Sequence, residues 1–367
     1  MPGIGWAGKG IHKREKQNVR SVLHLPERVA LKKFFIWIGV CGLLLVAMGY
    51  YFLFASNTGD FRQKAFIYIP TGSSYAQLLQ QIEKNNLLHN LHSFDRMAQW
   101  LGLPNHLHAG KYQIREGMGN FTIAWMLKGG RQVPVRLVIR KMRTENDLVH
   151  KFSSELEPDS SSFKSLFHDT SFLNQYQLKP GEIQALILPD TYQFYWNTTA
   201  RKVLEKLGKN YRNFWNEERL RKAEKLNMRP AEIATLASIV EEETNLREDE
   251  PKVASTYLNR LRKGIPLQAD PTVKFGIGDF SIQRITGNHI QVSSPYNTYK
   301  NKGLPPGPIC TPSAHSIDAV LDAPQTDYLY FCASWKLDGH SDFTASYEEH
   351  LRNAKKYQQA LNERGIH

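Results

Sequence analysis

One long apolar stretch near the start of the chain limits most strongly what it can fold into. Residues 34–54 read FFIWIGVCGLLLVAMGYYFLF and contain no charged side chain. A helix of this length rises about 31 Å, which is enough to cross the hydrocarbon core of a bilayer. A secretory signal has a shorter apolar region and a cleavage site of small residues, and a core helix usually has a polar face. We therefore interpret residues 34–54 as an uncleaved transmembrane helix.

The charges on either side of this helix predict its orientation. Residues 1–33 carry eight Lys and Arg side chains against only Glu15 and Glu27, whereas residues 55–59 carry no charge. Positive charge concentrates on the cytosolic side of membrane proteins. We expect a single-pass protein whose basic segment, residues 1–33, lies in the cytosol and whose remaining chain lies outside the cytoplasm, with the lipid bilayer as the partner of residues 34–54.

The location of the charge also bears on nucleic-acid binding. The formal net charge of the chain is +12, and about half of the excess lies before the apolar stretch. The rest is spread along the exported part without a dense basic run, which argues against nucleic acid as a partner. No CxxC or HExxH spacing occurs, so we expect no metal and no cofactor. Cys310 and Cys332 could pair in an oxidising compartment or remain buried thiols, and the sequence leaves both possibilities open.

The exported part begins with a small module. Residues 66–69 predict a strand, helices follow from Tyr75 and from about Ser93 to Gly102, and residues 108–114 predict a second strand. This order resembles a LysM-type sugar-binding module, which here either binds glycan or only packs against the rest. A helix over 121–127 and an alternating strand over 133–139 lead onward. The predicted fold class is α+β, with a LysM-like βααβ module over 65–140 and an α+β catalytic domain over 141–360.

Residues 230–244 predict a helix that carries three consecutive glutamates near its end. Pro230 suits a first helical turn. The helical wheel gathers apolar side chains on one face, places Glu242 opposite them in solvent, and places Glu241 and Glu243 at the boundary. Partial desolvation there can raise a carboxyl pKa into the range of a general acid. The alternative is three surface glutamates without chemistry.

The helix is followed by segments rich in turn residues. A second helix is expected from Pro251 up to Gly264, and residues 266–272 predict a loop that carries Gln268 and Asp270. Residues 294–299 and 303–309 predict further loops, stiffened by proline. Rigid loops of this kind can hold a binding surface in place.

Several long strings in this part of the chain identify a family. LASIVEEET, VASTYLNRLRKGIPLQADPTVKFGIG, SPYNTY and GLPPGPICTPS, with LPDTY and HAGKYQI upstream, resemble the endolytic murein transglycosylase (YceG-like) family over roughly residues 65 to 355. The chain departs from the usual family pattern at Leu188, where a Phe is common, and at Cys310, where a small residue is common. Neither departure touches the glutamates.

The resemblance implies an enzyme of the bacterial cytoplasmic (inner) membrane that cuts peptidoglycan. Such a lyase breaks the bond between N-acetylmuramic acid and N-acetylglucosamine in nascent glycan strands and leaves 1,6-anhydro-muramyl ends. It needs one carboxylic acid and no cofactor, and its expected partners are glycan strands and the cell-wall synthases at the membrane.

Matching the motifs residue by residue assigns roles to individual side chains. The acid is placed at Glu241, with Glu243 as the second choice. Candidates for positioning the sugar or the acid are Gln268, Asp270, Tyr296 and Asn297, whereas His340 and His350 are expected to be structural.

Two other functions stay open at this point. One is a catalytically silent scaffold that binds peptidoglycan. The other is a hydrolase of the same glycan, which needs a second carboxylate facing Glu241; Asp270 is the nearest candidate.

Overall fold

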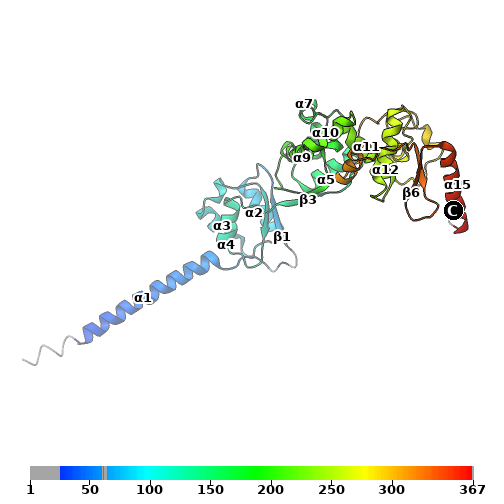
Figure 1. Cartoon of the computed structure of the whole chain (residues 1–367). Helices are drawn as coiled ribbons and strands as arrows, with labels where there is room; N and C mark the ends of the chain where they lie inside the picture. Colours follow the sequence, from blue (N-terminus) through cyan, green and yellow to red (C-terminus); the bar gives the residue numbers. More distant parts are fainter. Residues whose placement is uncertain (1–24, 60, 62–63, 366–367) are drawn as a thin grey trace, which may run out of the picture. The chain divides into compact units, whose positions relative to one another are not determined.

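The structure, a computed structural model, describes residues 25–59, 61 and 64–365. Its described residues form two compact units. The first contains the chain up to residue 67 together with residues 73–108 and 112–131. The second contains residues 68–72 and 109–111 and the chain from residue 132 onward. Helices and short two-stranded sheets occur in both parts (Figure 1). The mixture confirms the predicted α+β class.

The apolar stretch lies within one long helix, α1 (Leu25–Phe54). Within it, Leu31–Tyr51 has a mean hydropathy of 2.0 and no buried share. This confirms a helix long and apolar enough to cross a membrane. The helix begins earlier than residue 34, so part of the expected basic segment is helical; residues 1–24 lie outside the described residues.

The predicted order strand, helix, helix, strand is confirmed over residues 65–114. The serine before α2 forms a capping box with Gln77, which fixes the start of that helix. The second helix begins two residues before Ser93, because Asn90 caps it. Similarity to LysM modules stays a prediction. The elements are β1 (Ala65–Ile69), α2 (Tyr75–Lys84), α3 (Leu91–Trp100), a 3-10 turn (Leu103–Asn105), β2 (Gly110–Ile114) and α4 (Asn120–Lys128).

A buried asparagine joins the end of α1 to this module. Asn57 is 6% exposed. Its amide nitrogen donates to the Asn90 carbonyl at 2.8 Å and to Asn120 Oδ1 at 2.6 Å, and its amide oxygen accepts from the Asn90 N–H at 2.8 Å. One side chain thus satisfies polar groups at the start of α3 and at the start of α4.

The second unit opens with an antiparallel strand pair. β3 (Val135–Ile139) pairs with β4 (Asp190–Phe194), with Val135 opposite Phe194. Alternate residues of β3 are buried, as the alternating sequence predicts. The helices between β3 and α11 in the chain are α5 (Glu145–Glu155), α6 (Ser160–Phe167), α7 (Thr170–Asn174), α8 (Ile183–Leu186), α9 (Ala200–Phe214) and α10 (Glu217–Lys225).

The core of this unit surrounds α11 (Pro230–Glu243). Every residue from Ile233 to Val240 is buried, so the prediction of a single buried face is wrong. Neighbouring segments cover the helix on all sides, which a helical wheel cannot represent. The remaining elements are α12 (Glu250–Arg262), α13 (Asp270–Ile277), a 3-10 turn (His289–Gln291), α14 (Ala314–Leu321), β5 (Tyr330–Ala333), β6 (Ser341–Thr344) and α15 (Tyr347–Glu363).

One predicted loop is wrong at its end. Residues 270–272 do not belong to a loop but form the first turn of α13. Pro271 explains the difference, because its fixed φ and missing N–H are tolerated at the start of a helix. Asp270 therefore projects from a helical turn.

Replacing Asn57 by alanine should destabilise the first unit. The change leaves the Asn90 N–H and Asn120 Oδ1 without these partners in a buried place, at a cost of about 1–3 kcal/mol. Thermal unfolding of the full chain in detergent should show a lower midpoint for the transition of this unit. Asn85→Ala is the control, because it removes an exposed hydrogen bond to the Gln81 carbonyl. Equal midpoints for the two variants would contradict the role given to Asn57.

Candidate active site

The three glutamates at the end of α11 each meet a different neighbour. Glu241 lies against the start of α14, where its Oε2 accepts hydrogen bonds from the Ser313 N–H at 2.7 Å and from the Ser316 hydroxyl at 3.1 Å. Ser313 is also the N-cap of α14. Glu241 thus fastens α14 to α11.

Glu242 does not point into open solvent, so that prediction is wrong. Its carboxylate binds Lys141 Nζ at 2.6 Å and Arg143 at 3.1 Å, and its side chain is only 14% exposed. The segment after β3 passes over this side of the helix and supplies both cations. Glu242 is therefore a partly buried, doubly paired anion.

Glu243 has a phenol as its partner rather than a cation. Tyr257 of α12 donates its hydroxyl hydrogen to Glu243 Oε1 at 2.7 Å. Burial raises the pKa of Glu243 from 4.5 to about 7; the Tyr257 hydrogen bond opposes this rise and the charge of Asp270 adds to it. A carboxyl with this pKa is partly protonated near neutral pH, as a general acid requires.

A cavity of about 280 Å³ opens beside Glu243. It is wide enough for about one sugar ring and contains carboxyl, phenol, guanidinium, amide and imidazole groups. Glu241 does not line it. The lining residues are Glu243, Tyr257, Arg260, Leu267, Gln268, Asp270, Tyr299, Tyr330, Phe331 and His350.

The cavity includes two of the residues proposed from sequence as substrate contacts. Asp270 accepts the hydroxyl hydrogen of Tyr299 at 2.6 Å. Gln268 has φ +55°, which lies in the left-handed region of backbone conformation, and its side chain is exposed. Its Oε1 accepts from Arg260 at 3.2 Å. Both side chains are thus held in place by neighbours in the cavity wall.

The other two proposed contacts do not line this cavity. Tyr296 packs against Phe275, with ring centroids 4.5 Å apart. Asn297 is fully buried, and its amide donates to the carbonyls of Ile290 and Val292. Asn297 therefore shapes its own loop.

Several cavity residues were not selected from the sequence. Tyr257 and Arg260 lie one helical turn apart on α12. A basic side chain at this spacing in an otherwise apolar pattern could have indicated a polar site on this face of the helix. Arg260 is held by the carbonyls of Leu267 and Leu329, both at 2.7 Å. Tyr330 belongs to β5 and His350 to α15. No local sequence pattern predicts that these two residues line the cavity.

The two histidines expected to be structural occupy different places. His340 Nδ1 lies 3.2 Å from Asp249 Oδ1 and does not line the cavity. His350 does line it, stacked on Tyr330 with ring centroids 5.5 Å apart. Burial, together with the charge of Arg260, lowers the pKa of His350, which favours a neutral imidazole.

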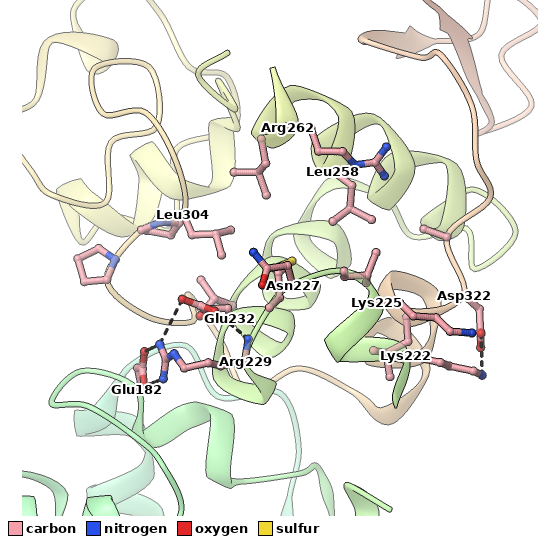
Figure 2. Close-up of a pocket in the computed structure, with 18 of the residues that line it drawn as sticks. Glu182, Lys222, Lys225, Asn227, Arg229, Glu232, Leu258, Arg262, Leu304 and Asp322 are labelled. Atoms are coloured by element: carbon pink, nitrogen blue, oxygen red, sulfur yellow. Dashed lines mark hydrogen bonds and ion pairs between the residues drawn. The ribbon is translucent and has the colours of Figure 1, made fainter. Parts of the chain in front are cut away.

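A larger hollow, of about 1270 Å³, lies elsewhere in the second unit. Figure 2 shows that its carboxylates face cations: Arg229 binds Glu182 at 2.8 Å and Glu232 at 3.5 Å. Lys222 binds Asp322 at 2.7 Å. Glu182, Glu232 and Asp322 thus each have a cation as a partner, whereas the hydrogen-bond partner of Glu243 is a phenol.

The described part of the chain contains neither a disulfide nor a three-residue metal cluster. Cys310 and Cys332 are free, and Cys310 is buried with its sulfur 3.7 Å from the Ser238 carbonyl oxygen. No group of three His, Cys, Asp or Glu side chains there is arranged to hold a metal ion.

Comparison with known proteins places the chain in a family. The YceG-like family matches residues 67–356, which is most of the chain. The chain belongs to the YceG-like family. The family resemblance seen in the motifs is thereby confirmed.

Relatives within the YceG-like family carry a named activity. An endolytic murein transglycosylase of Bacillus subtilis is 28% identical over 320 residues, covering 83% of this chain and 88% of that protein. One of Streptococcus pneumoniae is 26% identical, covering 79% of this chain but only 57% of that protein. The 2.6 Å crystal structure of a YceG-like protein of Listeria monocytogenes aligns with a TM-score of 0.53 at 27% identity, covering 80% of this chain and 99% of that one.

Replacing Glu243 by glutamine should change how stability depends on pH. The wild-type carboxyl has its full stabilising effect below about pH 4.5 and loses it as pH rises through about 7, because unfolding lets it ionise. The variant has no such loss. Its free energy of unfolding relative to wild type should rise by about 2–3 kcal/mol between pH 4 and pH 8.

Thermal or urea unfolding at the two pH values measures this difference. The exposed Glu248→Gln is the matched control and should follow the wild-type curve. A constant difference between Glu243→Gln and wild type at both pH values would show that the folded-state pKa is not raised.

Proposed function

We propose that the protein is a membrane-anchored endolytic murein transglycosylase with Glu243 as its acid. It cleaves the bond between N-acetylmuramic acid and N-acetylglucosamine within nascent glycan strands of peptidoglycan. The relatives' named activity supports the substrate and reaction class. The observation that carries the assignment of the acid is the position of Glu243: its pKa is raised to about 7 and it lines a cavity of sugar size.

The reaction needs one group that first gives and then takes a proton. Glu243, protonated, donates its hydrogen to the glycosidic oxygen as the bond from muramyl C1 to that oxygen breaks. The resulting carboxylate removes the proton of the muramyl C6 hydroxyl, and O6 bonds to C1 to close the 1,6-anhydro ring. The proton count balances, no water is consumed, and Glu243 ends protonated for the next cycle.

The neighbouring groups suit this cycle. The Tyr257 hydroxyl stabilises the carboxylate form at the middle of the cycle, and the nearby Asp270 charge restores the protonated form at its end. Gln268, Asp270 and Tyr299 offer an amide, a carboxylate and a phenol to the sugar. Glu241, the first choice from sequence, instead has its Oε2 occupied by two donors of α14.

The proposal includes the location of the protein. α1 anchors it in the bacterial cytoplasmic membrane, and the basic charge before residue 34 sets the N-terminus in the cytosol and the two units outside. Nascent glycan strands and the synthases that make them are found at this surface and are the proposed partners.

A second candidate is favoured by one observation. Asp270 lines the same cavity as Glu243, so the cavity holds the two carboxyl groups that a hydrolase would use. A hydrolase releases reducing ends and a lyase releases 1,6-anhydro ends. A silent scaffold that only binds peptidoglycan releases neither.

The deciding experiment digests purified sacculi with wild type, Glu243→Gln and Glu241→Gln, followed by mass spectrometry of the fragments. We expect anhydro-muramyl ends from wild type and a loss of at least about 100-fold in Glu243→Gln, because the proton donor is gone. Glu241→Gln should keep most of the activity, since an amide oxygen can still accept from Ser313. Loss in Glu241→Gln with activity retained in Glu243→Gln would reverse the assignment, and reducing ends would establish the hydrolase.

A further inference from the structure

Aromatic rings continue from the end of α1 onto the outer face of α4. Ring centroids lie 5.0 Å apart for Tyr50 and Phe54, and 5.6 Å apart for Phe54 and Phe121. Phe121 then stacks on Trp125 at 5.9 Å with an interplanar angle of 8°. We call these four side chains the aromatic ladder. It joins α1, the apolar helix, to α4, a helix of the folded module.

The junction between the two helices is closely packed. Ser56 forms an isolated bridge with Gly119, and the Asn57 N–H donates to the Met118 carbonyl at 3.0 Å. A Cβ atom on Gly119 would lie 2.8 Å from the Ala55 carbonyl oxygen, closer than atoms tolerate. Only glycine permits this approach, so α4 is fixed to the end of α1.

The depth of the ladder follows from helix geometry. The apolar span ends at Tyr51. Phe54 is three residues later, about 4.5 Å farther along the axis. The headgroup layer on each side of the hydrocarbon core is about 5–7 Å thick. With α1 across a bilayer, Phe54 lies at the boundary between the hydrocarbon core and the headgroups and brings Phe121 and Trp125 close to that boundary.

The face of α4 that carries the ladder is not used by the core of the module. Ile123, Ala124 and Leu127 are buried, whereas Trp125 is 44% exposed. Lys128 Nζ lies 6.0 Å from the Trp125 ring centroid and donates to the Leu101 carbonyl at 2.7 Å. Tryptophan beside lysine is typical of surfaces at the boundary between lipid and water.

We propose that Phe121 and Trp125 form a membrane-seating surface that inserts among the lipid headgroups beside α1. This inference rests on the proposed membrane anchoring and goes beyond it. Because the packed junction already fixes α4 to the end of α1, the two rings are ordered before they meet the headgroups, and their insertion loses little further entropy.

The test uses the full chain in vesicles of phosphatidylcholine and phosphatidylglycerol (3:1) whose acyl chains carry bromine at carbons 6 and 7, which quenches nearby tryptophan. The chain has seven tryptophans, so variants are compared by difference. Trp125→Phe keeps a ring in the aromatic ladder. In this variant the drop in tryptophan emission caused by bromine should be smaller than in wild type by the contribution of one tryptophan. The matched control is Trp335→Phe in the second unit, 48% exposed in the free chain, which should remove only unquenched emission.

Each outcome bears on a different proposal. The chain could float with the vesicles while bromine removes the same amount of tryptophan emission from wild type and from Trp125→Phe. This result would overturn the membrane-seating surface but not the membrane anchor. A chain that does not float would overturn both. Stronger quenching of Trp125 by bromine at carbons 11 and 12 than at 6 and 7 would place it too deep for the seat. A chain inactive on sacculi that still shows the Trp125 signal would overturn the proposed reaction alone.

Discussion

The burial of α11 on all sides is the constraint on which the second unit depends. A helix without a solvent face must leave its charged residues at its ends, and three consecutive carboxyl groups lie together at the end of α11. A buried carboxyl needs a donor or a counter-ion, or it must take up a proton. Glu241 receives two donors from α14 and Glu242 receives two cations from residues 141 and 143. Glu243 receives one phenol hydrogen.

The three glutamates have unequal sets of partners, and the proposed assignment of the acid to Glu243 follows from this difference. Glu241 fastens α14 to the central helix, and Glu242 fastens the segment after β3. Glu243 has one neutral donor and a neighbouring negative charge, and burial, to which that charge adds, raises its pKa to about 7. In the larger hollow, a single cation, Arg229, pairs with both Glu182 and Glu232.

Local patterns predicted those elements whose signals are local. Three such signals are the capping serine before α2, Pro230 at the start of α11 and the alternation along β3. Each acts only on residues within its own segment, so each marks a helix start or a strand without reference to the rest of the chain. The wheel misplaced Glu242 because it assumes that the side opposite the apolar band meets water. The cavity could be predicted only in part for the same reason. Gln268 and Asp270 lie in recognisable strings, but Tyr330 and His350 come from distant segments.

The presence of Asp270 beside Glu243 does not by itself require a hydrolytic mechanism. A second carboxylate can act as a base toward water, but it can also act only through its charge. Its charge contributes to raising the pKa of Glu243, while its own oxygen is engaged by the Tyr299 hydroxyl. In the proposed lyase cycle the Glu243 carboxylate takes the C6 hydroxyl proton as O6 bonds to C1, and a fixed negative neighbour makes Glu243 a stronger base at that step. Removing that charge should therefore slow ring closure while leaving the anhydro product unchanged, since no group that activates water has been lost.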